Sequence, residues 1–254
     1  YSDLAIVYFY RTVGEGRDAP RTSLWDGESY LFNQNSTQKL PNATSADDHY
    51  MELDKNEKDL LAYVCGQECF EDVIVVITSG SQIETDFLED PAYNGKIKAA
   101  MWAGSNMGGY SAIPKIIKGQ LNPSGRTVDT WSRDFTKDPT WQNFGTQLTY
   151  NGNQYTNLTS ANGSKYVIYK EGIYIGYRYY ETRGYEEEQD GNAGWYDENV
   201  NYPFGYGLSY TTFDKRIVSS APATEDLSAL DKIDITVEVT NNGQVAGKDV
   251  VQIY

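Results

Sequence analysis

Two neighbouring stretches decide the fold, the apolar run Leu4–Tyr10 (LAIVYFY) and the segment Gly14–Asp18 (GEGRD) that follows it. The first predicts a strand buried on both faces, as in a parallel sheet. Glycine on both sides of Glu15 allows a sharp turn and lets another molecule approach closely. Because open α/β sheets bind ligands at the carboxyl ends of their strands, Glu15 is either a catalytic or ligand-facing acid or a solvated turn residue.

Strands and helices alternate after this segment. Further buried strands are predicted over 73–77 and 97–102, each ending in small polar residues. A helix is predicted over 54–66, where Asp54 and Glu57 have the spacing of a capping box, and another over 110–117. This order predicts an α/β domain with a mostly parallel sheet flanked by helices.

Composition limits the classes of function. The chain has 254 residues with 39% hydrophobic residues, enough for one or two globular domains. Its 36 acidic and 21 basic residues give a formal charge of −15, which argues against nucleic-acid and membrane-surface partners and favours a neutral substrate. The 22 Tyr and 5 Trp suit sugar faces, although aromatic rings also fill sheets.

Cysteine and histidine usage predicts no metal site and no cofactor. Cys65 and Cys69 are close in sequence, but the spacing is poor for a disulfide within a helix, so two free thiols are expected. His49 is the only histidine, which leaves a zinc site short of ligands. No signal-peptide pattern opens the chain, and the compartment, cytoplasmic or secreted, stays open.

The second half is more irregular. An acidic loop is expected at 186–190 and a linker at 216–231. Alternating apolar residues over 233–239 predict a strand, and a turn at 241–243 leads to a further strand from 249. Because two strands alone are marginal and no strand precedes the first one, we expect part of the fold to lie outside this sequence.

The sequence resembles glycoside hydrolase family 3, the family of β-glucosidases and related exo-glycosidases. The resemblance runs in family order over nearly the whole chain, in segments that are listed here: Gly14–Gly16 (GEG), Val73–Ser81 (VIVVITSGS), Trp102–Gly104 (WAG), Gly119–Gly125 (GQLNPSG), Tyr169–Tyr180 (YKEGIYIGYRYY), Phe204–Phe213 (FGYGLSYTTF) and Val239–Gly247 (VTNNGQVAG). The resemblance implies an α/β sandwich domain over 1–215 whose N-terminal part is missing. A linker over 216–231 and the first strands of an incomplete fibronectin type III-like domain over 232–254 would follow.

The resemblance also implies a function. Glu15 matches the general acid/base of a retaining, exo-acting β-glucosidase that removes terminal non-reducing β-D-glucosyl residues. The Asp nucleophile would come from a (β/α)₈ barrel that lies outside this chain, so the chain alone is expected to be inactive. Two alternatives stay open: a noncatalytic carbohydrate-binding or scaffolding module, and a β-xylosidase or β-N-acetylglucosaminidase of the same family.

Several residues near Glu15 are candidates for substrate binding. Arg17 and Asp18 either contact sugar hydroxyls or form an ion pair within the loop. Trp25 is a candidate for stacking on a sugar, and Trp102 either stacks on a sugar or packs in the core. The expected partners are a β-glucoside or cello-oligosaccharide and the missing barrel.

Overall fold

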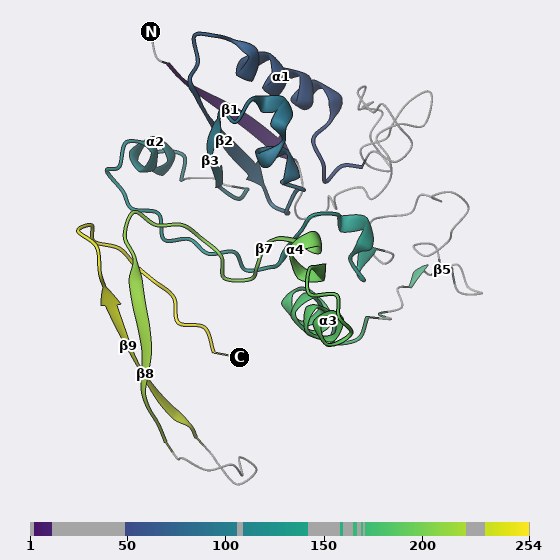
Figure 1. Ribbon diagram of the computed structural model, residues 1–254, viewed down its shortest axis with the longest axis vertical. Helices are drawn as coiled ribbons and strands as arrows, with labels where there is room; N and C mark the ends of the chain where they lie inside the picture. The colour runs from purple at the N-terminus through teal and green to yellow at the C-terminus, as the bar shows by residue number, and fades with distance from the viewer. Residues whose placement is uncertain are drawn as a thin grey trace. The chain divides into compact units, whose positions relative to one another are not determined.

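Three parallel strands form the central sheet of the computed structural model, in the order β1-β2-β3 (Figure 1). Their bounds are Leu4–Arg11 for β1, Asp72–Ser79 for β2 and Ile97–Trp102 for β3. All three strands were predicted from sequence, and the α/β class is confirmed. Because the strands are parallel, their carboxyl ends meet at one edge of the sheet, although the register between β2 and β3 shifts once, between Val73 and Ile74.

The structure describes residues 3–11, 49–105, 109–141, 158–159, 165–166, 169, 171–221 and 232–253. The chain divides into two compact units. Unit 1 comprises Tyr1–Met107 and Asp129–Pro203, and unit 2 comprises Gly108–Val128 and Phe204–Tyr254. Within the described ranges, no helix combines the length and apolar character needed to cross a membrane.

Helix α1, Lys55–Gly66, begins as the sequence predicts. Asp54 accepts a hydrogen bond from the Glu57 backbone N–H at 2.9 Å, and the Glu57 carboxylate accepts one from the Asp54 N–H at 2.9 Å. This reciprocal capping box satisfies backbone donors that the first turn leaves free. Leu61 and Cys65 of α1 are buried against the sheet.

Strand β1 differs from its prediction in burial. Val7 and Phe9 are buried in the core with β2 and α1, but Ile6, Tyr8 and Tyr10 are 53%, 45% and 57% exposed. The prediction of a strand buried on both faces is therefore wrong for β1. The predicted burial of the strand over 97–102 is wrong as well, because no residue of β3 is buried. Successive side chains point to opposite faces of a strand, and only one face of β1 is covered.

The rest of unit 1 consists of short elements around this sheet. Three are 3₁₀ helices: η1 (Asp86–Glu89), η2 (Pro91–Tyr93) and η3 (Phe135–Lys137). Two are antiparallel strand pairs: β4 (Trp131–Ser132) with β7 (Val200–Tyr202), and β5 (Leu158–Thr159) with β6 (Lys165–Tyr166). The others are helices α3 (Tyr177–Gln189) and α4 (Trp195–Asn199).

The acidic loop predicted at 186–190 is wrong, because residues 186–189 are the last turn of α3. Arg183 pairs with Glu186 and Glu187 on that turn, so the acidic residues have helical neighbours that offset their repulsion.

Unit 2 contains helix α2, Ala112–Ile117, and an antiparallel pair, β8 (Phe213–Ala221) with β9 (Asp234–Asn241). The helix predicted over 110–117 and the strand predicted over 233–239 are confirmed. Asp249 joins two segments of this unit, because its carboxylate lies 3.1 Å from the Arg126 guanidinium and 2.9 Å from the Lys215 amine.

Strand pairing in unit 2 differs from the prediction. The turn at 241–243 is present, with Asn241 accepting a hydrogen bond from the Gly243 N–H at 3.0 Å, but residues 249–253 form no strand. The partner of β9 is β8, which begins at Phe213 and runs through residues 216–221 of the predicted linker. Ile217 and Val218 in that segment have high strand preference, and its pairing with β9 makes it part of a strand. Residues 222–231 of the linker lie outside the described residues.

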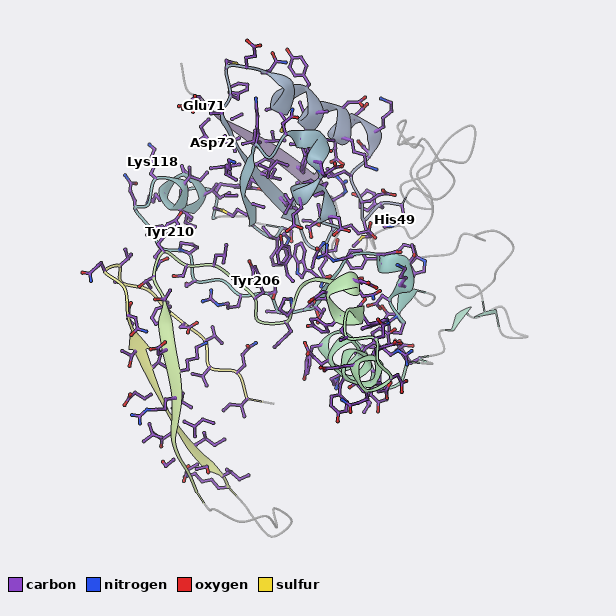
Figure 2. All side chains as sticks on the ribbon, viewed as in Figure 1. His49, Glu71, Asp72, Lys118, Tyr206 and Tyr210 are labelled. Atoms are coloured by element: carbon purple, nitrogen blue, oxygen red, sulfur yellow. The ribbon has the colours of Figure 1, made fainter. Side chains whose placement is uncertain are left out.

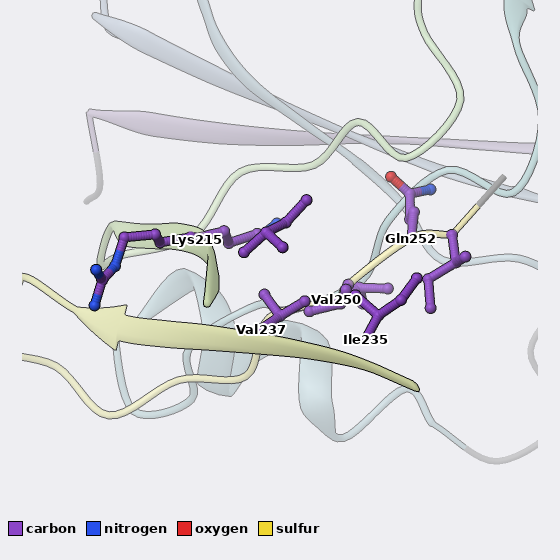
Figure 3. Close-up of a pocket in the computed structure, with 9 residues that line it drawn as sticks. Lys215, Ile235, Val237, Val250 and Gln252 are labelled. Atoms are coloured by element: carbon purple, nitrogen blue, oxygen red, sulfur yellow. The ribbon is translucent and has the colours of Figure 1, made fainter. Parts of the chain in front are cut away.

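A groove of about 400 Å³ lies between β8, β9 and the segment 250–253 (Figure 3). Its walls are mainly aliphatic, including Ile235, Val237, Val250 and Val251. Such a surface resembles the core-facing side of a sheet more than a sugar site, where a few polar groups orient the ligand.

Candidate active site

The carboxyl edge of the central sheet is the part of unit 1 to which the sequence assigns chemistry. Strand β1 ends at Arg11, which is paired with Ser79 at the end of β2, and Ile77 of β2 is paired with Trp102 at the end of β3. Figure 2 shows His49 near this end of the sheet and Glu71 and Asp72 at the opposite end. The chain leaves β1 at this edge, four positions before Glu15.

The four predicted site residues, Glu15, Arg17, Asp18 and Trp25, lie outside the described residues. Their roles stay predictions. The described residues nevertheless show how both ends of segment 12–48, which contains all four, are attached to the sheet.

Arg11 makes the most extensive set of contacts at this edge. Its side chain is buried, and Nε and Nη2 donate hydrogen bonds to the backbone carbonyls of Tyr50 at 3.1 Å and Glu52 at 2.8 Å. The two terminal nitrogens also contact both carboxylate oxygens of Glu57. Burial by itself lowers the pKa of Arg11, but the hydrogen bond and charge of Glu57 outweigh it and raise the pKa above its usual value.

His49 anchors the far end of the same segment. Its Nδ1 accepts a hydrogen bond from the Met51 N–H at 3.3 Å, which leaves the proton on Nε2, 3.2 Å from a Glu84 carboxylate oxygen. Glu84 accepts a further hydrogen bond from the Phe135 N–H at 2.8 Å. His49 is buried, and its contacts hold the backbone of residues 49–52 in place.

Trp102 packs against the domain, as one of the two roles left open by the sequence requires, and keeps part of its ring exposed. Its Nε1 donates a hydrogen bond to the Ser79 carbonyl at 3.1 Å, and its ring packs edge-on against buried Trp131 with centroids 5.6 Å apart. The residue is still 40% exposed. Trp102 is therefore a rigidly held aromatic at the carboxyl edge, with part of its surface free for contact.

A second polar group lies beside this edge. The Tyr180 hydroxyl donates to the Asp138 carboxylate at 3.0 Å, and Asp138 also accepts from the Thr140 N–H and hydroxyl at 2.8 and 2.5 Å. Burial of Tyr180, together with the Asp138 charge, raises the pKa of the phenol. For nearby Asp129, burial and then repulsion from Asp138 raise the carboxyl pKa, although a hydrogen bond from Gln82 opposes them.

Sequence reasoning missed Arg11, Glu84 and the Tyr180–Asp138 pair. One signal for Arg11 was present, because a charged residue closes an otherwise apolar strand. The partners of Arg11 are 39 to 46 positions away, and no local pattern connects them.

The sequence also led us to expect no metal site and two free thiols, Cys65 and Cys69. Among the residues that the structure describes, no group of three or more His, Cys, Asp or Glu side chains could hold a metal ion. Cys65 and Cys69 are both free, the first buried and the second exposed. Burial raises the pKa of the Cys65 thiol, which disfavours the reactive thiolate.

The parallel sheet and its polar carboxyl edge define an α/β domain of the type that binds ligands where its strands end. The glycosyl hydrolase family 3 C-terminal domain matches residues 1–177 of the chain. The chain therefore belongs to glycosyl hydrolase family 3, as the sequence motifs indicated.

Curated relatives agree with this assignment. Beta-glucosidase A of Butyrivibrio fibrisolvens is 33% identical over 264 residues, which cover 100% of this chain and 28% of that protein. Thermostable beta-glucosidase B of Acetivibrio thermocellus is 30% identical over 208 residues, 81% of this chain and 22% of that protein. The chain thus spans about a quarter of the length of these relatives.

Solved structures share the fold. A beta-glucosidase from Paenibacillus barengoltzii superposes with a TM-score of 0.63 at 26% identity, over 95% of this chain and 20% of that one. The beta-glucosidase from Kluyveromyces marxianus in complex with glucose gives a TM-score of 0.57 at 24% identity, over 95% and 21% of the two chains. At 24% identity, the similarity to the Kluyveromyces marxianus enzyme supports the shared fold alone.

Proposed function

We propose that this chain is part of a retaining, exo-acting β-glucosidase and that Glu15 is its general acid/base. The Asp nucleophile would come from a (β/α)₈ barrel outside these residues, and the substrate would be a β-glucoside or cello-oligosaccharide. In this proposal the α/β sandwich covers 1–215 and the fibronectin type III-like domain begins at 232. Strand β8 runs across the first of these boundaries, so residues 216–221 belong to β8 and the linker is reduced to 222–231.

One structural observation carries the proposal. Strand β1 ends at Arg11 at the carboxyl edge of a parallel sheet, and the Gly-Glu-Gly motif follows within a few residues. Because α/β sheets bind ligands at this edge, a carboxyl residue that follows it so closely in sequence supports the role proposed for Glu15. The relatives named as beta-glucosidases support the reaction class.

The chemistry requires two carboxyl groups with different tasks. In a retaining glycosidase they lie about 5–5.5 Å apart, one attacking the anomeric carbon and the other protonating the leaving oxygen. The protonating group later removes a proton from the water that releases the sugar. An acid that works near neutral pH needs a raised pKa, from burial or from a neighbouring carboxylate, and the nucleophile of the barrel would supply such a neighbour.

Arg17, Asp18 and Trp25 are proposed to contact the sugar near Glu15. Charged groups can bond sugar hydroxyls, and an aromatic ring can pack on the apolar face of the ring. Single substitutions of these residues would raise KM for the glucoside if the contacts exist.

Replacing Glu15 with Gln in the full-length enzyme tests the proton-donor role. Cellobiose has a poor leaving group, so its kcat/KM should fall by about 10²–10⁴-fold. 2,4-Dinitrophenyl β-glucoside needs no protonation to leave, so its kcat/KM should change little. Steady-state kinetics on both substrates measures the difference.

Two further measurements sharpen this test. In Glu15→Ala, azide should restore turnover of the activated glucoside and yield β-glucosyl azide. Azide needs no general base, because it attacks the anomeric carbon without losing a proton, and its attack breaks the bond between the sugar and the nucleophile.

The matched control is Glu71→Gln, which changes an exposed acid at the opposite end of the sheet and should leave kcat and KM unchanged on both substrates. Equal losses on both substrates without azide rescue would reject the role of Glu15, and wild-type activity on both would favour a noncatalytic module.

A further inference from the structure

Arg11 connects the two ends of the segment that contains Glu15. It is the last residue of β1, immediately before segment 12–48, and it hydrogen-bonds the carbonyls of Tyr50 and Glu52, which come just after that segment. One side chain therefore joins the chain on either side of a long connection. The inference drawn from it rests on the proposed role of Glu15.

The attachment is rigid for three reasons. The Arg11 side chain is only 7% exposed, so water competes little for its donors. Its planar guanidinium engages Glu57 with two nitrogens, a geometry that fixes orientation as well as distance. The Tyr50 ring lies 5.4 Å from the guanidinium carbon, which adds a cation–π contact.

Glu57 is itself held in place, so the attachment extends to helix α1. The carboxylate oxygen that contacts Arg11 Nη2 also accepts the Asp54 N–H of the capping box at 2.9 Å. Glu57 thus connects the end of β1 to the first turn of α1. Losing either partner would leave a buried charge unpaired, which costs more than the pair contributes.

The returning end of the segment has a second attachment. The His49 backbone N–H donates to the Glu52 carboxylate at 3.0 Å, and its ring contacts Glu84. The Glu84 N–H in turn donates to the Met51 carbonyl at 2.6 Å. Residues 49–52 are therefore held against β2 and its following loop at the same place where Arg11 binds them.

We propose that Arg11 is a positioning residue for the general acid/base. Glu15 follows Arg11 by four positions, a reach of about 14 Å at most along the chain. The contacts of Arg11 therefore fix the point from which the chain leaves the sheet toward Glu15. A general acid must be placed precisely, since a displacement of about 1 Å can cost about 10²-fold in rate.

The test is Arg11→Lys in the full-length enzyme. Lysine keeps the charge but cannot contact two carbonyls and both oxygens of Glu57 at once. The kcat/KM for cellobiose should fall about 10- to 10²-fold, whereas the kcat/KM for 2,4-dinitrophenyl β-glucoside should fall less than about threefold. Such a difference is expected when proton donation to the leaving group is impaired. If Arg11→Lys fails to fold, Glu57→Gln carries the same expectation, because it removes the charge that orients Arg11.

A matched control separates positioning from simple loss of stability. Leu61→Ala creates a cavity under α1 at a fully buried site and removes none of the hydrogen-bonding groups that hold Arg11. It should lower Tm and reduce kcat/KM equally for both substrates. If Arg11→Lys lowers kcat/KM equally for both substrates and in proportion to its fall in Tm, as expected for Leu61→Ala, the proposal is overturned.

The double variant Glu15→Gln/Arg11→Lys tests whether Arg11 acts through Glu15. If it does, adding Arg11→Lys to Glu15→Gln causes no further loss on cellobiose, because the group being positioned is already absent. Multiplicative losses would reject the proposal while leaving the role of Glu15 intact. If Glu15→Gln shows no dependence on the leaving group, the proposed function fails and the role of Arg11 fails with it.

Discussion

At the scale of single residues, Tyr180 shows how burial and one partner decide protonation. The residue is 2% exposed, and its hydroxyl donates to Asp138. Burial and the nearby carboxylate both disfavour the phenolate, so the pKa of Tyr180 is raised above its ordinary value. Tyr180 therefore stabilises the fold only as a neutral hydrogen-bond donor.

Tyr180→Phe should lower the free energy of unfolding at neutral pH by about 1 kcal/mol, because a buried hydrogen bond is lost. Above about pH 10, the ordinary pKa of tyrosine, the unfolded state releases this proton while the folded state keeps it. Stability from Tyr180 is thus present below pH 10 and is lost as the pH rises above it. Urea unfolding at pH 7 and from pH 9 to 11 should show a shallower alkaline loss in the variant.

The matched control is Tyr185→Phe on the same helix, where the side chain is 65% exposed. It should change neither the stability at neutral pH nor the alkaline slope. An alkaline slope in Tyr180→Phe identical to that of the wild type would contradict the assignment of the raised pKa.

At the scale of elements, helices α3 and α4 approach closely at a glycine. A Cβ added at Gly184 would lie 2.8 Å from the Cδ2 atom of Tyr196. Tyr196 also donates a hydrogen bond to Glu181 of α3 at 2.5 Å, so its ring is held in place. The absence of a side chain at residue 184 is what allows this packing.

Gly184→Ala should destabilise the chain despite the better helix propensity of alanine. Overpacking costs about 1–3 kcal/mol, which exceeds the gain of about 1 kcal/mol from replacing glycine in a helix. The control is Gly66→Ala at the end of α1, where an added Cβ meets nothing within 4 Å. Thermal unfolding should give a lower Tm for the first variant and an equal or higher Tm for the second; a Gly184→Ala variant as stable as wild type would contradict the packing argument.

At the scale of the whole molecule, the chain matches only part of the length of its curated relatives. It spans 28% and 22% of two curated beta-glucosidases. A retaining reaction needs two carboxyl groups across the scissile bond, and the proposal assigns one of them to a barrel outside this sequence.

The chain purified alone should therefore give no turnover of p-nitrophenyl β-glucoside above the level of its own Glu15→Gln variant, which serves as the blank for contaminating enzyme. The full-length enzyme should hydrolyse the same substrate under the same conditions. Turnover by the isolated chain that disappears in Glu15→Gln would contradict the assignment of the nucleophile to a separate barrel.

Much of unit 1 could be predicted because its signals are local. Apolar runs predicted β2 and β3, and the spacing of Asp54 and Glu57 predicted the capping box of α1. Two of the errors concern features that depend on distant partners, the open face of β1 and the pairing of β9 with β8. The helical turn at residues 186–189 was missed although its pairs with Arg183 are local.

The sequence by itself determined the order of strands β1 to β3 and helices α1 and α2, the motif around Glu15 and the family, because these depend on residue types at short spacing. Only the tertiary structure decided which face of β1 is covered and which partners Arg11 and His49 have. Burial and hydrogen bonding between residues 39 or more positions apart depend on how the chain returns to the sheet, and no local pattern encodes that return.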